Sequence, residues 1–301
     1  MKLASLKKYL EHPSLISDRF WKLINPLCSD RLFVEIDYYR SFHRKLNLKN
    51  PTYFSEKLQW LKLYDRNPDY TIMADKARAK DYVSKKTNGE CKTIPTIGLW
   101  KSAKDINIDE LPDRFVLKCN HNSGAIWICH DKNTFDLETA QREIEENLRY
   151  NYYYSGREWP YKNIEPCVLA EPYIEEASTD YKFYCFGGTP RFLYVSTGLA
   201  NHDTARISFI TLDWQFAPFI RNDFSPFEEL PPKPSQLDRM ITLAEELSKG
   251  IPFVRVDLYQ IGNSVYFSEL TFFPCSGMMH FHPDEWDRIL GGDLSLPIHK
   301  Q

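Results

Sequence analysis

Charged side chains recur at strand spacing in two segments near the C-terminus, which are predicted to form a hairpin. Arg255 and Asp257 alternate with apolar residues, so in a strand they would share one face and the apolar residues the other. On the partner strand Glu269 and Thr271 share a face, and an odd loop, such as 262–264, would set the two acids opposite each other. Adjacent carboxylates repel unless a cation neutralises them, and their hard oxygens, beside phosphates, suit Mg2+. The alternative is a solvated sheet face on which Arg255 pairs with the acids, and the hairpin alone does not decide between them.

Lys118 lies between an apolar strand and a loop of small polar residues. The loop consists of Asn120, His121, Asn122, Ser123 and Gly124. Such a loop exposes backbone N–H groups, and a lysine beside it supplies a point charge, which together suit phosphate oxygens. The simpler interpretation, without further support, is a strand-end lysine that reaches solvent before a turn. Lys76 at a helix start and Glu171 at the end of an apolar strand add support, although neither is specific by itself.

Sharper motifs of other protein classes are absent from the sequence. The chain has no P-loop, no G-x-G-x-x-G, no H-E-x-x-H and no D-x-D, which disfavours P-loop nucleotidases, Rossmann dehydrogenases and zincins. Cys275, His280 and His282 lie in one loop, but they lack a fourth ligand and a recognised zinc spacing. We expect them to serve ordinary roles in the loop and at the rim of an active site.

Alternating short strands and helices would position these residues. Helix-like spacing predicts a helical segment to about residue 65 and a further helical stretch over 74–85. Other helices are predicted after Asp136 as an N-cap, and after Ser235, where a capping-box pattern begins a helix that ends at Gly250. The predicted strands are 115–119, 125–129, 167–170, 181–186, 191–196, 253–260 and 265–272. The mixture argues for α+β layers.

Composition limits the class of protein and its compartment. The 301 residues, 43% of them hydrophobic, are enough for one large domain or two intimate ones. A net charge of -3, from 38 basic and 41 acidic residues, disfavours a nucleic-acid binder and favours a charged small molecule as partner. Seven cysteines without a C-x-x-C pair fit free thiols in the cytoplasm, and no apolar run is long enough to span a membrane. The basic, aromatic segment 19–24 would suit weak contact with an anionic membrane surface, although packing onto the protein is the favoured alternative.

The order of these pieces resembles the ATP-grasp superfamily, for which D-alanine:D-alanine ligases are a useful reference. Residues 73–80 resemble its M-D-K-x-x-x-K segment, and residues 115–124 resemble its lysine strand with the phosphate loop. Residues 168–174 resemble the hinge that holds adenine, residues 255–257 the R-x-D strand and residues 269–271 the E-x-N strand. Thr271 stands where the general pattern has asparagine. A closer resemblance is to the TupA-like ATP-grasp family, named for teichuronopeptide biosynthesis, which has a similar leader to 46–62, a similar 180–182 segment and an E-x-T ending.

The resemblance implies an α+β ATP-grasp fold, in which two α+β subdomains grip ATP between them after a mostly helical N-terminal segment. The implied boundaries are 1–70 for the helical segment, 71–172 for the first subdomain and 173–301 for the second. The N-terminal segment does not resemble the βαβ domain that usually precedes the two ATP-grasp subdomains.

The resemblance also implies roles for single residues. The implied ATP-binding residues are Lys76, Lys118, Asn122, Ser123, Gly124, Glu171, Tyr173, Ile174 and Asp180. Among them, Lys76 and Lys118 would hold the α- and β-phosphates. The carboxylate of Glu171 would accept a hydrogen bond from the adenine amino group, and the backbone of Tyr173 and Ile174 would contact the adenine base. Asp257 and Glu269 would hold Mg2+. The implied catalytic residues are Arg255, Lys182, Ser276 and Gly277, of which the arginine would stabilise phosphoryl charge and the last two a tetrahedral oxyanion.

The implied reaction joins a carboxylate to an amine through an acyl phosphate. The association of the family with cell-surface polymers implies a uronic acid as the carboxylate and an amino acid as the amine, giving an amide-decorated polysaccharide or its precursor. Two other classes stay open, which are a glycosyltransferase of surface-polysaccharide assembly and a nucleotide-binding protein without catalysis.

Overall fold

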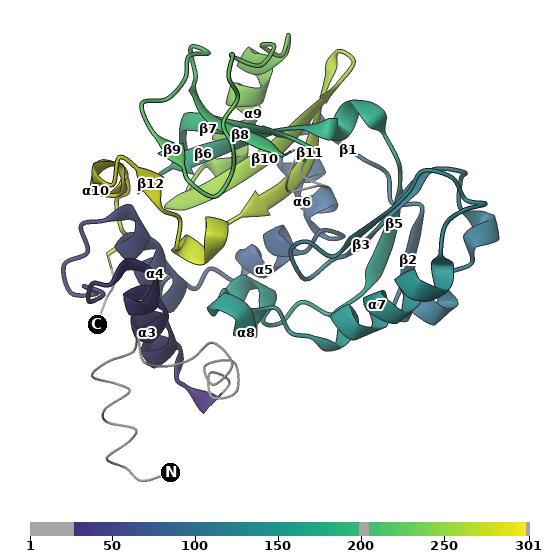
Figure 1. Ribbon diagram of the computed structural model, residues 1–301, viewed down its shortest axis with the longest axis horizontal. Coiled ribbons are helices and arrows are strands. Elements are labelled where there is room, and N and C mark those ends of the chain that lie inside the picture. The colour runs from purple at the N-terminus through teal and green to yellow at the C-terminus, as the bar shows by residue number, and fades with distance from the viewer. Residues whose placement is uncertain (1–26, 199–204, 299–301) are drawn as a thin grey trace.

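Two main sheets form the framework of the protein (Figure 1). The structure is a computed structural model and describes residues 27–198 and 205–298. The larger sheet contains β1 (Lys92–Thr93), β6 (Thr179–Phe186), β7 (Thr189–Thr197), β8 (Arg206–Thr211), β10 (Phe253–Ile261) and β11 (Ser264–Thr271), in the order β1-β11-β10-β6-β7-β8. The smaller contains β2 (Gly98–Trp100), β3 (Phe115–Cys119), β4 (Ile126–Cys129) and β5 (Val168–Pro172), in the order β2-β5-β3-β4. A short pair, β9 (Ile220–Arg221) and β12 (Phe281–His282), forms a third sheet.

Helices cover one face of each main sheet (Figure 1). The first helices of the described chain lie together beside the larger sheet. The helices are α3 (Asp30–Phe42), α4 (Phe54–Tyr64), α5 (Asp69–Ala74), α6 (Ala79–Lys86), α7 (Leu137–Arg149), α8 (Tyr153–Gly156), α9 (Leu237–Ser248) and α10 (Glu285–Asp293). Helix α9 packs on β6, β7 and β10, and α7 buries Ala140 and Ile144 in the core of the smaller sheet. Helices α5 and α6 contribute residues to the core of the larger sheet. The subdomain boundary expected at residue 71 stays a prediction.

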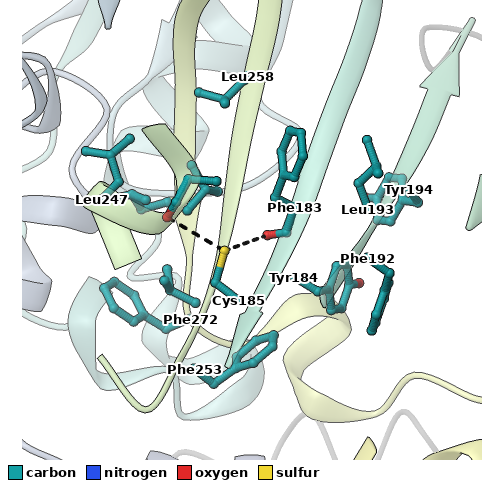
Figure 2. Close-up of a cluster of buried hydrophobic side chains, with 14 of the residues drawn as sticks. Phe183, Tyr184, Cys185, Phe192, Leu193, Tyr194, Leu247, Phe253, Leu258 and Phe272 are labelled. Atoms are coloured by element: carbon teal, nitrogen blue, oxygen red, sulfur yellow. Dashed lines mark hydrogen bonds between the residues drawn. The ribbon is translucent and has the colours of Figure 1, made fainter. Parts of the chain in front are cut away.

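Strand alternation divides the larger sheet into an apolar face and a charged face. The Cys185 thiol of β6 points toward α9 and hydrogen-bonds to the Ala244 carbonyl oxygen at 3.8 Å (Figure 2). Its neighbour Tyr184 projects from the other face, where its ring stacks on Phe192 with centroids 4.8 Å apart. Tyr184 lies opposite Arg255 in the ladder between β6 and β10. The face opposite α9 is therefore the one that carries the charged residues.

A β-bulge, and not an odd loop, brings the two acids of the hairpin together. Ile261 pairs with Ser264, so the loop between β10 and β11 holds two residues, and the prediction of an odd loop is wrong. The register shifts by one residue beside Asp257, which leaves Ser268 as the extra residue on β11. Asp257 therefore pairs with Glu269 as expected, although by a different route.

Most other predicted elements are present with small changes. The mixed α+β class is confirmed, strand 115–119 matches β3, and the Asp136 side chain accepts from the Thr139 N–H to cap α7. The predicted helix over 74–85 is interrupted, because the backbone becomes extended at Asp75. The capping box at Ser235 is wrong, since α9 begins after Gln236 without a side-chain cap.

The structure contains a strand that was not predicted, and it does not describe a segment for which a role was expected. Strand β8 adds an edge to the larger sheet that the sequence analysis did not predict. The segment 19–24 lies outside the described residues. Within the described ranges, no helix is both long and apolar enough to cross a bilayer.

Helix α10 lies unusually close to the start of α4. Arg44 Nη2 donates to Asp287 Oδ2 at 2.6 Å, and the Ser55 N–H donates to Asp287 Oδ1 at 2.8 Å. A Cβ on Gly291 would lie 2.1 Å from the carbonyl oxygen of Thr52. The two segments can approach this closely only because residue 291 has no side chain.

Gly291→Ala is expected to destabilise the protein by about 1–3 kcal/mol, since backbone atoms must move to admit the methyl group. Gly292→Ala is the matched control, because a Cβ there meets nothing within 4 Å. The control should keep or slightly raise the free energy of unfolding, since alanine favours helix. Urea unfolding followed by circular dichroism measures both, and equal stability of the two variants would contradict the close packing.

Candidate active site

Arg255 lies at the centre of a charged cluster on the face of the larger sheet opposite α9. Its Nε and Nη2 atoms donate to Oδ1 and Oδ2 of Asp257, each at 2.7 Å. Nη2 also donates to Glu269 Oε1 at 2.9 Å and to Thr271 Oγ1 at 3.0 Å. Lys182 of β6 donates to Asp257 Oδ2 at 2.7 Å. The side chains predicted from strand parity to share one face do so, and Lys182 joins them from the neighbouring strand.

Burial and neighbouring charges shift the pKa values of this cluster in opposite directions. Burial raises the pKa of Asp257, although Arg255 and Lys182 oppose the shift. Burial by itself would lower the pKa of Lys182, but Asp180 and Asp257 keep it well above its usual range. Burial would raise the pKa of Glu269, but the nearby cations hold it well below its usual range. Lys182 and Glu269 are therefore ionised at neutral pH.

A second cluster, of lysines around Glu171, lies on the smaller sheet. Lys118 Nζ donates to Glu171 Oε2 at 2.6 Å, and Lys80 Nζ lies 2.5 Å from Glu171 Oε1. Lys80 is also anchored to the Ile94 carbonyl oxygen at 2.8 Å. Although burial would raise the pKa of Glu171, the two lysines lower it below its usual value. With both oxygens engaged, Glu171 orients Lys118 and Lys80 in this structure.

Lys76 lies between the loop after Lys118 and the first cluster. Its Nζ donates to the carbonyl oxygen of Asn122 at 2.6 Å and lies 3.7 Å from Glu269 Oε2. Its backbone N–H donates to the Asn120 carbonyl oxygen at 3.1 Å. The polar loop that follows Lys118 is thus tied at two points to the lysine that faces the charged hairpin.

The tip of this loop is open to solvent, whereas its start is anchored. Asn122 is buried and its Nδ2 donates to Asn147 Oδ1 at 3.2 Å. Ser123 and Gly124 are exposed, and Gly124 has a φ of +81°, in the region that favours glycine. The backbone at the tip can therefore approach an anion closely.

The predicted adenine hinge lines a cleft of about 500 Å³. Its walls are Arg114, Tyr173, Ile174, Glu175 and Glu176. Exposed Ile126 and Ile128 lie across the ladder from Lys118 and Val116, so they share the sheet face of Lys118. An apolar surface therefore lies beside the lysine cluster, as a planar base requires.

The loop with Ser276 and Gly277, a short 3₁₀ turn labelled η7 (Pro274–Gly277), is held by α4. Gln59 Nε2 donates to the carbonyl oxygens of Ser276 at 3.1 Å and Gly277 at 3.2 Å, and Lys62 Nζ donates to the Ser276 carbonyl oxygen at 2.8 Å. Sequence reasoning missed Gln59, Lys62 and Lys80. Their only signal was their place in segments that resemble the family, 46–62 and 73–80.

Asp257 and Glu269 fit Mg2+ by ligand type but do not form a complete cage. Hard carboxylate oxygens are its preferred protein ligands, and Mg2+ usually keeps several waters and substrate oxygens. Both Asp257 oxygens accept from cationic side chains, whereas Lys76 Nζ lies 3.7 Å from Glu269 Oε2, beyond hydrogen-bond distance. Across residues 27–198 and 205–298, no three His, Cys, Asp or Glu side chains converge as a metal site. The two carboxylates therefore fit an ion that also takes phosphate oxygens as ligands.

Comparisons with known proteins place the chain in a family. Similar solved structures include the D-alanine–D-alanine ligases of Bacillus anthracis (20% identity, TM-score 0.41, 67% of this chain and 57% of that one) and Helicobacter pylori (14%, 0.46, 83% and 68%). Another is a RimK-domain ATP-grasp protein of Sphaerobacter thermophilus DSM 20745 (12%, 0.41, 77% and 70%).

The chain thus spans little more than half the length of the Bacillus ligase. No curated protein matches it significantly. The model of the family described as TupA-like ATP-grasp matches residues 56–295, which include both charged clusters and the loop at Ser276. The chain therefore belongs to the TupA-like ATP-grasp family.

Proposed function

We propose that the protein is an ATP- and Mg2+-dependent ligase that joins a carboxylate to an amine through an acyl phosphate. The observation that carries the proposal is the position of Lys76, which contacts the loop after Lys118 and faces Glu269. In this proposal the loop binds phosphate beside a carboxylate pair that suits a metal, as phosphoryl transfer requires.

ATP would lie between the two sheets. Its phosphates would contact Lys76, Lys118 and the backbone of Ser123 and Gly124, while the base would lie near Tyr173 and Ile174 in the cleft. Lys80 would act with Lys118, since both bind Glu171. Because Glu171 is engaged by two lysines, a bond from the adenine amino group to its carboxylate would need one lysine to move.

Asp257 and Glu269 would hold Mg2+, which supplies charge neutralisation on the β- and γ-phosphates when bound. Arg255 would exchange its contacts with these carboxylates for contacts with the transferred phosphoryl group. Lys182 orients Asp257 through the bond at 2.7 Å and favours its charged form. Asp180 in turn fixes Lys182 Nζ at 3.1 Å.

The reaction would proceed in two displacements. A substrate carboxylate oxygen attacks the γ-phosphorus, the bond to the β-phosphate oxygen breaks, and ADP leaves. An amine then attacks the acyl carbon, forms the C–N bond and displaces inorganic phosphate. Arg255 would stabilise charge in the first step, and loop N–H groups near Ser276 and Gly277 would stabilise the oxyanion in the second.

A uronic acid of a surface polysaccharide or its precursor is the proposed carboxylate, and an amino acid is the proposed amine. Both follow from the resemblance to a family named for teichuronopeptide biosynthesis, and so does the proposed cytoplasmic location. The two subdomains would divide near residue 172, at the end of β5.

ADP release tests the function. Purified protein with ATP and Mg2+ should release ADP only when glucuronate or galacturonate is present, and glycine or glutamate should raise the rate. A glycosyltransferase would instead release UDP from UDP-sugars, and a non-catalytic nucleotide-binding protein would bind ATP and release neither. Either of the last two results would overturn the proposal.

A further inference from the structure

A buried lysine and a buried glutamate lie behind Ser276. Lys62 of α4 is 1% exposed and Glu158, just after α8, is 4% exposed. Lys62 Nζ donates to Ser276 Oγ at 3.1 Å, and the Ser276 hydroxyl donates to the Gly156 carbonyl oxygen at 3.4 Å. Glu158 Oε1 lies beside this hydroxyl, 3.3 Å from the point that a Cβ on Gly156 would occupy. Three segments far apart in the chain thus meet at one hydroxyl group.

The backbone fixes the position of this hydroxyl. Ser276 has a φ of +54°, in the left-handed region that serine rarely adopts. A Cβ on Gly156 would lie 1.9 Å from Ser276 Oγ, so only glycine leaves room for the side chain. Ser276 is half-buried, whereas Lys62 and Glu158 are buried, so of the three side chains only the serine reaches solvent appreciably.

Glu158 differs from the other carboxylates of the site in its ion pairing. Asp257 and Glu269 each accept a hydrogen bond from Arg255. For Glu158, no lysine or arginine nitrogen lies within 4.0 Å in the part of the chain that the structure describes, although Arg255 and Glu269 are near enough to influence its charge. A buried carboxylate without an ion pair, next to a phosphoryl-transfer site, is suited to accept a proton.

We propose that Glu158 accepts, through the hydroxyl of Ser276, the proton that the amine substrate loses when it attacks the acyl phosphate. This inference rests on the proposed function. As the C–N bond forms, the C–O bond to phosphate breaks and phosphate leaves with the electron pair. The amine proton passes to Ser276 Oγ while the Ser276 proton passes to the Glu158 carboxylate. Lys62 holds Ser276 and stabilises the charged form of Glu158.

Titration of the pair agrees with this role. Burial raises the pKa of Glu158, and Lys62 opposes the shift. Burial lowers the pKa of Lys62, and Glu158 and Asp37 oppose that shift. The groups that face Glu158 from the elements around it are Lys62, Tyr152, Tyr161, Arg255, Glu269 and Ser276. A carboxyl group with a raised pKa accepts a proton from an amine more readily than an ordinary glutamate does.

Hydroxylamine separates proton acceptance from the rest of the reaction. It is largely unprotonated at neutral pH and traps an acyl phosphate as a hydroxamate without a base. Glu158→Gln should lower amide formation from glucuronate or galacturonate and glycine by about 100-fold or more, the range of general base catalysis. Hydroxamate formation from the same acid should stay within about 3-fold of the unmodified protein. Glu146→Gln, on the exposed side of α7, is the matched control and should change neither rate.

The pH profile adds a reading that a structural role would not change. The rate with glycine should rise as Glu158 ionises, and Lys62→Met should move this rise to higher pH, because Lys62 lowers the pKa of Glu158. Equal loss of amide and hydroxamate in Glu158→Gln, or an unmoved pH profile in Lys62→Met, would overturn the inference. Absence of hydroxamate from the unmodified protein would instead overturn the proposed function, and this inference with it.

Discussion

Asp257→Asn is expected to cause the largest loss of stability, about 3–5 kcal/mol, together with loss of ATP turnover. Asp257 is fully buried and accepts from Arg255 and Lys182. Removing its charge leaves two buried cations uncompensated, which costs more than the pair itself contributes. Turnover should fall because Arg255 loses its orientation and the carboxylate pair that suits Mg2+ loses one member. Urea unfolding and ADP release measure the two effects.

Asp105→Asn is the control for this change. Asp105 is exposed, so its loss of charge should change the free energy of unfolding by no more than about 0.5 kcal/mol. If Asp257→Asn behaved like this control in both assays, the charged cluster would have neither the structural nor the catalytic role assigned to it.

Lys118→Ala should lower the rate of ADP release by about 10²- to 10³-fold, the usual effect of removing one preorganised charge from such a site. The side chain is 20% exposed and Nζ binds Glu171 at 2.6 Å. Lys80 still pairs with Glu171 in the variant, so the fold should be retained. Steady-state ADP release and ATP binding by calorimetry separate loss of turnover from loss of affinity.

Lys101→Ala tests whether any lysine near this sheet gives the same effect. Lys101 is 80% exposed and pairs with the exposed Glu165, so the variant should keep full activity. Unchanged affinity and turnover in Lys118→Ala would mean that Lys118 is an ordinary strand-end lysine, and the phosphate assignment would be lost.

Local pattern accounts for much of the framework. Alternation along β10 placed Arg255 and Asp257 on one face, because side chains of a strand alternate whatever the tertiary context. Asp136 marked the start of α7 because an N-cap acts on N–H groups of the same turn. The edge strand β8 was not predicted, because its place in the sheet depends on pairing with β7 and not on a local sequence pattern.

The sequence by itself determined the strand faces, the polar loop after Lys118 and the membership of Asp257 and Glu269 in one hairpin. The tertiary structure decided their register, because the bulge at Ser268 depends on how β11 packs between β1 and β10. It also decided that Lys62 and Glu158 lie beside Ser276. Contacts between α4, the segment after α8 and η7 join residues more than 90 positions apart, and no local spacing encodes such contacts.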